Sequence, residues 1–400
     1  MGRFGAVDWA AMESVTSSQA KLLATIEPLL EGFAARAAGH DREGSFPFEN
    51  FEALREVGYV KAAVPRELGG WGHGLGDVLR AQMAIARADG STAYSIGMHQ
   101  ITVGREVSAE SWPAEARERI FREVASEGTW INSIASEPEL GSPQGGGRPA
   151  TTLTPDGAGH WRLNGRKIFS TLAPVLTYFV TYAAIEDGSG EVCRVAVRRG
   201  APGLRVETTW DGVGLRASGS DDVVYEDVPV ADEDILVRSR QGGTSQSLGD
   251  FSWFALLVGG ANLGIAEAAR NYAVRFAQER KPTGYAEPIA SIPYIRQEIA
   301  RVDQSLMAAR ALMFEVADTW DSDPSLRGGP LAAKTAAAKL LATDTAVQVV
   351  DRSMRVVGGA SLHRSEPLER YYRDVRGGLA NPPIEPRALE MIARAALDGE

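Results

Sequence analysis

Few residues in this chain combine the type and the spacing of a catalytic or metal-binding group. The five histidines are scattered, with no spacing typical of a zinc site, and Cys193 is the single cysteine. We therefore expect no metal centre and no internal disulfide. His99, on an amphipathic helix, by itself indicates a structural histidine, and Glu385, in a proline-rich stretch, by itself indicates a solvated loop residue. Residue types alone define no reaction, so the interpretation depends on the order of longer motifs.

Composition limits the class of protein. The chain has 400 residues, enough for two or three domains. Its net charge of −10 and its pI of about 5.2 argue against nucleic acid or an anionic membrane as the main partner. The first residues do not resemble a secretory signal, and no window approaches about 18 uninterrupted apolar residues. We expect a cytoplasmic enzyme with no membrane span.

The texture of the sequence changes twice along the chain. Residues 1–128 show apolar positions at helical spacing, interrupted by glycines and prolines. Residues 129–237 show short alternating runs separated by turn signals, which predicts a small antiparallel β domain. Residues 238–400 return to long, alanine-rich amphipathic segments that predict three or four antiparallel helices in a bundle. The expected class is mainly α with a central β domain.

Six motifs then occur in order over nearly the whole chain, and together they resemble the acyl-CoA dehydrogenase superfamily. They are Val64-Pro-Arg-Glu-Leu-Gly-Gly-Trp-Gly72, Ala135-Ser-Glu-Pro138, Leu163-Asn-Gly-Arg-Lys167 with Phe169-Ser-Thr171, Gly214-Leu-Arg-Ala-Ser-Gly-Ser220, Val224-Tyr-Glu-Asp-Val-Pro-Val230 and Pro367-Leu-Glu-Arg-Tyr-Tyr-Arg-Asp-Val-Arg376. The resemblance implies the fold of that superfamily: an N-terminal helical domain, a middle antiparallel β-barrel domain and a C-terminal four-helix bundle. It also implies a homotetramer, with a dimer as the next expectation.

The resemblance implies a bound flavin, either FAD or FMN. An aromatic residue, hydroxyls and a guanidinium would contact the ring and the pyrophosphate, and a glycine pair would allow close approach of backbone to the adenine side. The residues assigned by the resemblance are Ser136, Phe169, Ser170, Thr171, Arg280, Arg355, Gly358 and Gly359. The contact of Arg280 commonly crosses a subunit interface in the family. Thr283 replaces the aromatic residue that the family has beside this arginine.

The catalytic residue of the dehydrogenases is a glutamate at one of two positions, which removes the α-proton of an acyl thioester. These positions correspond here to Pro382 and Phe254, and neither is acidic. The chain is more similar to the branch of flavin-dependent monooxygenases with a type 2 C-terminal domain. These enzymes receive reduced flavin from a separate reductase and oxygenate a small-molecule substrate. The resemblance places His99 as proton carrier, and Asn381, where the branch often has a second histidine, as a polar orienter.

Two other functions stay open. The first is an FAD-dependent dehydrogenase of an acyl thioester that recruits Glu385 as base and passes electrons to a partner protein. In the loop that could contact the 3′-phosphate of CoA, Arg148 is the single basic candidate. The second is a catalytically degenerate subunit that only binds a ligand.

Overall fold

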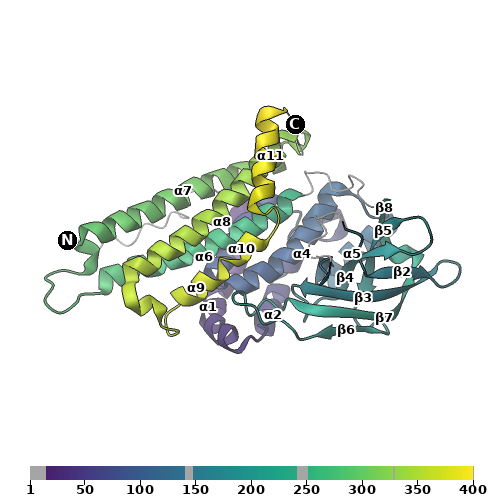
Figure 1. Cartoon of the computed structure of the whole chain (residues 1–400), viewed down its shortest axis with the longest axis horizontal. Coiled ribbons are helices and arrows are strands. Elements are labelled where there is room, and N and C mark those ends of the chain that lie inside the picture. Colours follow the sequence, from purple (N-terminus) through teal and green to yellow (C-terminus); the bar gives the residue numbers. More distant parts are fainter. Residues whose placement is uncertain (1–14, 140–146, 241–250, 328, 400) are drawn as a thin grey trace.

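The computed structural model describes residues 15–139, 147–240, 251–327 and 329–399. Figure 1 shows helices at the two ends of the chain packed side by side, with a β domain at one end of the molecule. This arrangement confirms the predicted fold class. The predicted domain boundaries near residues 128 and 237 stay predictions.

The N-terminal part is helical. Thr16 caps the first helix through a capping box with Gln19, and Asp89 caps the fourth by accepting from the N–H groups of Ser91 and Thr92. The helices are α1 (Ser17–Glu43), α2 (Phe48–Glu56), α3 (Leu75–Ala88), α4 (Gly90–Ala109) and α5 (Ala114–Glu127), with short 3-10 turns η2 (Tyr59–Lys61) and η3 (Arg66–Leu68).

The middle part is a sheet in the order β6-β7-β3-β2-β4-β5-β8, with β1 also paired to β4. Its strands are β1 (Ile131–Ile134), β2 (Thr152–Pro155), β3 (His160–Ser170), β4 (Tyr178–Ile185), β5 (Glu191–Arg198), β6 (Leu204–Glu207), β7 (Asp221–Ala231) and β8 (Ile235–Arg240). Most strand pairs are antiparallel, as the sequence predicts, but two pairs are parallel. The short strands β1 and β2 both run parallel to β4, and they pair with successive parts of it.

The C-terminal part contains three long helices followed by short ones. They are α6 (Ser252–Glu279), α7 (Pro293–Ser322), α8 (Gly329–Val357), η9 (Gly358–Leu362), α9 (Leu368–Asp374), α10 (Gly377–Ala380) and α11 (Glu385–Leu397). In Figure 1 the three long helices lie alongside one another, and α11 stands across the bundle. Among the described residues, α6 alone has the length and composition of a membrane span, but 89% of its apolar window is buried inside the protein, which is typical of a core helix.

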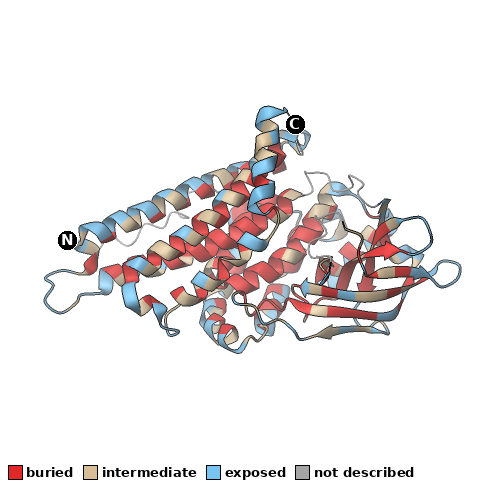
Figure 2. Ribbon diagram, viewed as in Figure 1, coloured by how far each residue is buried: buried red, intermediate tan, exposed pale blue. Residues whose placement is uncertain are grey.

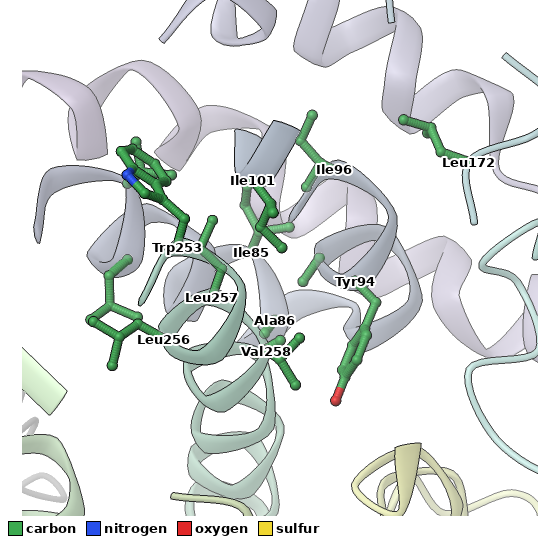
Figure 3. Close-up of a cluster of buried hydrophobic side chains, with 14 of the residues drawn as sticks. Ile85, Ala86, Tyr94, Ile96, Ile101, Leu172, Trp253, Leu256, Leu257 and Val258 are labelled. Atoms are coloured by element: carbon green, nitrogen blue, oxygen red, sulfur yellow. The ribbon is translucent and has the colours of Figure 1, made fainter. Parts of the chain in front are cut away.

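The core joins the first and last parts of the chain. Figure 2 shows α6 buried on nearly all sides, whereas α7 is buried along one stripe only. In Figure 3 the first turns of α6, with Trp253 and Leu257, lie against Ile85 of α3 and Ile101 of α4. Tyr94 belongs to the same cluster but points its hydroxyl away from it, towards Asn262, whose side-chain amide donates to that hydroxyl.

Candidate active site

The clearest candidate for a flavin wall is Phe169, at the end of β3. Strand β3 pairs with β7 in one register from Gly165 to Lys167, and the register shifts before Ser170. Such a bulge turns a side chain out of the regular alternation of a strand. Phe169 has a φ of 54° and its side chain is 61% exposed, both rare for a large aromatic residue. Its ring contacts Trp210 edge-on at 6.0 Å between centroids. The local fold therefore presents one face of this ring to the outside.

Backbone strain concentrates around the same point. Leu172 and Leu215 also have positive φ angles, of 74° and 52°. The two segments contact each other, because the N–H of Leu172 donates to the carbonyl oxygen of Ser218 at 3.2 Å. Residues held in sparsely populated backbone regions cluster at functional sites. The loop from Leu215 to Ser220 and the turn after Phe169 thus form one strained unit.

A chain of hydroxyl groups lies beside Phe169. The Oγ1 atom of Thr171 is 2.8 Å from the Oγ atom of Ser220, which is 2.8 Å from the Oγ atom of Ser218. Ser170 is fully buried, and its Oγ has no hydrogen-bond partner within the described ranges. Hydroxyls both donate and accept, so this chain can match either kind of polar atom on a ligand.

Ser136 lies next to this group of residues. Its carbonyl oxygen accepts from the N–H of Ile168 at 3.0 Å, one residue before Phe169. Beneath it, the buried ammonium of Lys167 bonds the Glu137 carboxylate at 2.6 Å, and this carboxylate also accepts from the N–H groups of Ala150 and Thr151. The structure therefore brings together the four ring contacts predicted in the β domain, Ser136, Phe169, Ser170 and Thr171.

The strained loop is fastened to the C-terminal helices. The N–H of Leu215 donates to Oδ1 of Asp374 at 2.6 Å, and a side chain at Gly214 would overlap the backbone of Arg373. Burial raises the pKa of Asp374 to about 7, against the opposing effects of the Leu215 hydrogen bond and the charge of Arg370. Asp374 is thus a joint between the β domain and the bundle.

Both positions at which dehydrogenases carry their glutamate lack a carboxylate. Phe254 lies in the first turn of α6, with its ring 6.0 Å from that of Phe251. Pro382 lies between α10 and α11. Glu385 is exposed in the first turn of α11, where a negative charge suits the helix dipole. This exposed position agrees with the solvated residue that the sequence context indicates, and it gives Glu385 no feature of a buried base.

His99 is buried within the N-terminal helices. Its Nε2 atom is 2.7 Å from the carbonyl oxygen of Val60, and its Nδ1 atom accepts from the N–H of Ile131 at 3.1 Å. Its ring packs edge-on against Trp130. Burial lowers the pKa of His99 to about 4, so the neutral ring is favoured. With both nitrogens bonded to backbone, this geometry favours a structural role over the proton-carrier role predicted for it.

Asn381 directly follows α10, and its side chain hydrogen-bonds back to the start of that helix. Its side-chain amide donates to the carbonyl oxygen of Gly377 at 2.8 Å, and its own carbonyl oxygen accepts from the Lys339 ammonium at 2.7 Å. The side chain is half-buried. Asn381 is therefore hydrogen-bonded both to α10 and to α8.

The remaining predicted flavin contacts lie elsewhere. Arg280 ends α6 and Arg355 lies in the last turn of α8, with Gly358 and Gly359 directly after it, and all four are exposed. Figure 1 shows these helix ends at the end of the bundle away from the β domain. One chain thus does not bring the two groups of predicted contacts together.

The residues at the β domain suit an isoalloxazine ring. They supply an exposed aromatic face, a hydroxyl chain at its edge and the unsatisfied buried Oγ of Ser170. Sequence reasoning missed Trp210, which supports the Phe169 ring, and gave no role to Ser218 and Ser220. The sequence signal for Ser218 and Ser220 was the motif Gly214–Ser220, in which these two serines alternate with small residues.

A separate open hollow of about 510 Å³ lies between α2 and the ends of β4 and β5. Phe48, Trp130 and Arg199 are among the residues that line it, and none of the predicted site residues does. The Arg199 guanidinium already donates to the carbonyl oxygens of Ala173 and Leu176. Within the described residues no group of histidine, cysteine and acidic side chains could hold a metal ion.

Comparison with known proteins gives matches over most of the chain. The acyl-CoA dehydrogenase N-terminal, middle and type 2 C-terminal domains match residues 16–127, 133–228 and 256–379. The "Putative acyl-CoA dehydrogenase YdbM" of Bacillus subtilis is 38% identical over 95% of this chain and 97% of its own length. The L-evernosamine nitrososynthase of a Micromonospora species is 35% identical over 93% and 90%.

A solved structure gives the same result. A KijD3 in complex with FMN and dTDP-3-amino-2,3,6-trideoxy-4-keto-3-methyl-D-glucose superposes with a TM-score of 0.85 and 31% identity. The match covers 97% of this chain and 95% of that one. The relatives are flavin-dependent oxidoreductases: dehydrogenases, monooxygenases and nitrososynthases. The chain belongs to the acyl-CoA dehydrogenase family of flavin-dependent oxidoreductases.

Proposed function

We propose that the protein is a monooxygenase that takes up reduced flavin and transfers oxygen to a small organic substrate. The observation that carries this proposal is the absence of a carboxylate at both base positions. Phe254 and Pro382 occupy them, and Glu385 is exposed on α11. An α-proton of an acyl thioester is weakly acidic and needs a desolvated base, which neither position provides.

Bound flavin would supply the oxygen activation, and the chain would bind and shield it. Phe169 would stack on one face of the ring, held in place by Trp210. Thr171 and Ser220 would hydrogen-bond its polar edge, with Ser136 on the neighbouring segment. Asn381 would orient the substrate, because an amide can hydrogen-bond but cannot act as a base at neutral pH. Apolar surroundings at such a site exclude water from the reaction.

The relatives support oxygen transfer and leave the acceptor atom open. The nitrososynthase relative and the KijD3 structure with an amino sugar nucleotide favour nitrogen as the acceptor. An amine on a small sugar is therefore the first substrate class to test. A reductase that delivers reduced flavin would be the protein partner, and the enzyme would work in the cytoplasm.

Oxidation of an acyl thioester is the second candidate, favoured by the name of the relative that is 38% identical. It would require FAD, and it would give Arg280, Arg355 and the pair Gly358–Gly359 a role. Because these residues lie at the far end of the bundle, a second copy of the chain would have to bring them to the flavin. FMN has no pyrophosphate or adenine and would not need them. In addition, the Arg148 guanidinium already donates to the carbonyl oxygen of Ile185 and to the Glu186 carboxylate, which makes it a weaker candidate for a contact with CoA.

One set of measurements separates the candidates. The protein would be loaded anaerobically with reduced FMN or FAD and mixed with oxygen in a stopped-flow spectrometer. A monooxygenase delays the return of the oxidised-flavin spectrum relative to flavin alone, and it incorporates ¹⁸O from ¹⁸O₂ into an amino sugar. A dehydrogenase instead retains tightly bound FAD that bleaches on anaerobic addition of an acyl-CoA. Failure to bind either flavin would support a degenerate binding subunit.

A further inference from the structure

The side chain of Lys339, on α8, occupies an unusual position. Its Nζ atom lies 2.9 Å from the carbonyl oxygen of Gly378, 2.7 Å from that of Asn381 and 3.0 Å from that of Pro383. An ammonium group has three N–H donors, so these carbonyls account for all of them. Lys339 is 1% exposed. One buried cation thus donates hydrogen bonds to three carbonyl oxygens of the same turn.

The charge has no carboxylate within hydrogen-bond reach among the residues described around it. Asp344, one turn further along α8, acts on Lys339 only through its charge, and the charge of Glu385 on α11 acts in turn on Asp344. Burial lowers the pKa of Lys339 to about 8. A lone buried charge is costly unless its hydrogen bonds are satisfied. The carbonyl dipoles of the turn fill that role, so Lys339 and the turn depend on each other.

The opposite side of the same turn faces the candidate site. A side chain at Gly378 would overlap the amide of Asn262, and one at Gly377 would approach Leu215 of the strained loop within 2.5 Å. Leu215 is bound to Asp374, and Asn262 is bound to Tyr94. The turn 377–383 is therefore packed between Lys339 on one side and the residues that fasten the β domain on the other.

We propose that Lys339 is a positioning residue, whose ammonium group fixes the turn 377–383, and with it Asn381, at the candidate active site. The catalytic consequence rests on the proposed function. The ordering of the turn does not, so the two can be tested separately.

The structural arm measures hydrogen–deuterium exchange of the segment 377–384 in the full-length protein, at the backbone amides of residues 377–381 and 384, since Pro382 and Pro383 carry no N–H. Lys339→Met should raise exchange of this segment at least tenfold while leaving the first turns of α8 protected. The matched control is Lys334→Met, which removes the same charge from the same helix at an exposed position paired with Glu315. Unchanged exchange in Lys339→Met, or an equal rise along all of α8, would overturn the proposal.

A second measurement covers the case in which Lys339→Met does not fold. In the wild-type protein, protection factors of residues 377–384 should fall between pH 7 and pH 9.5, because a neutral amine has one donor fewer. Among the described residues, the charge that acts on Lys339 is that of Asp344 on α8, and the ordinary pKa of an aspartate lies well below this pH range. Constant protection across this range would contradict the ordering role.

The catalytic arm compares product formed per flavin oxidised. Lys339→Met should lower this coupling several-fold at saturating substrate, Lys339→Arg should recover part of it, and Lys334→Met should match wild type. A wild-type protein without oxygen transfer would refute the proposed function and leave the exchange result standing. Altered exchange with unchanged coupling would show that the turn has no part in catalysis and would overturn that half of the proposal.

Discussion

Replacement of Phe169 by alanine tests the candidate flavin site most directly. The side chain is 61% exposed, and an aromatic side chain has roughly 200 Å² of surface, so about 120 Å² is available to a ligand. A stacked ring covers one face, or roughly half of this area. At about 25 cal/mol per Å², the contact contributes about 1.5 kcal/mol. We expect the Kd for FMN to rise about tenfold in Phe169→Ala.

The assay is an anaerobic titration of FMN followed by quenching of flavin fluorescence. Folding should change little, because an exposed ring contributes about 0.5 kcal/mol or less to the free energy of unfolding. Phe48→Ala is the matched control, since Phe48 is a similarly exposed phenylalanine at 56% and lies on α2. A Kd in Phe169→Ala within twofold of wild type, or an equal loss in Phe48→Ala, would refute the stacking argument.

Three further predictions concern buried charges. Lys167→Met leaves the Glu137 carboxylate without its buried partner, so urea denaturation should show a loss of about 3–5 kcal/mol, and a loss below about 1 kcal/mol would contradict the pairing. Burial lowers the pKa of His99 to about 4, so between pH 6.5 and pH 4 the unfolded chain binds a proton that the folded chain does not. Wild-type stability should therefore fall as pH drops from about 6.5 to about 4. His99→Gln should flatten this slope, and an unaltered slope would refute the assignment of the pH dependence to His99. Burial raises the pKa of Asp374 to about 7, so between pH 4 and pH 7 the folded chain holds a proton that the unfolded chain has lost. Stability should therefore fall as pH rises from about 4 to about 7. Asp374→Asn should remove this fall in the same denaturation series, and its persistence would show that another group is responsible.

The sequence predicted the fold well because fold is encoded by patterns repeated many times. Helical spacing before residue 128 and after 238, with alternating runs between, needed no knowledge of single contacts. The motif around Phe169 and Thr171 also placed candidate residues at the end of β3, since the sequence of this strand and its neighbours was recognisable. The bulge that exposes Phe169 was not predictable, because it depends on the pairing of β3 with β7.

Other features depend on contacts between residues far apart in the sequence. His99 was assigned a role from a resemblance, whereas its hydrogen bonds are made with Val60 and Ile131, which meet it only in the folded chain. Lys339 lies in an ordinary alanine-rich helix and carries no motif. Its three carbonyl partners lie about forty residues later. Patterns along the chain cannot report such pairs.

The contact between Gly214 and the backbone of Arg373 has a consequence for how ligands reach the protein. Two stretches of main chain meet there without intervening side chains, and the hydrogen bond from Leu215 to Asp374 lies directly beside them. Such a contact cannot lengthen or slide without being broken, so it does not act as a hinge. We therefore expect the β domain and the helices it touches to move as one body at this point. At the proposed site, flavin would then reach Phe169, at the end of the interior strand β3, by side-chain motion and not by the opening of one domain from another.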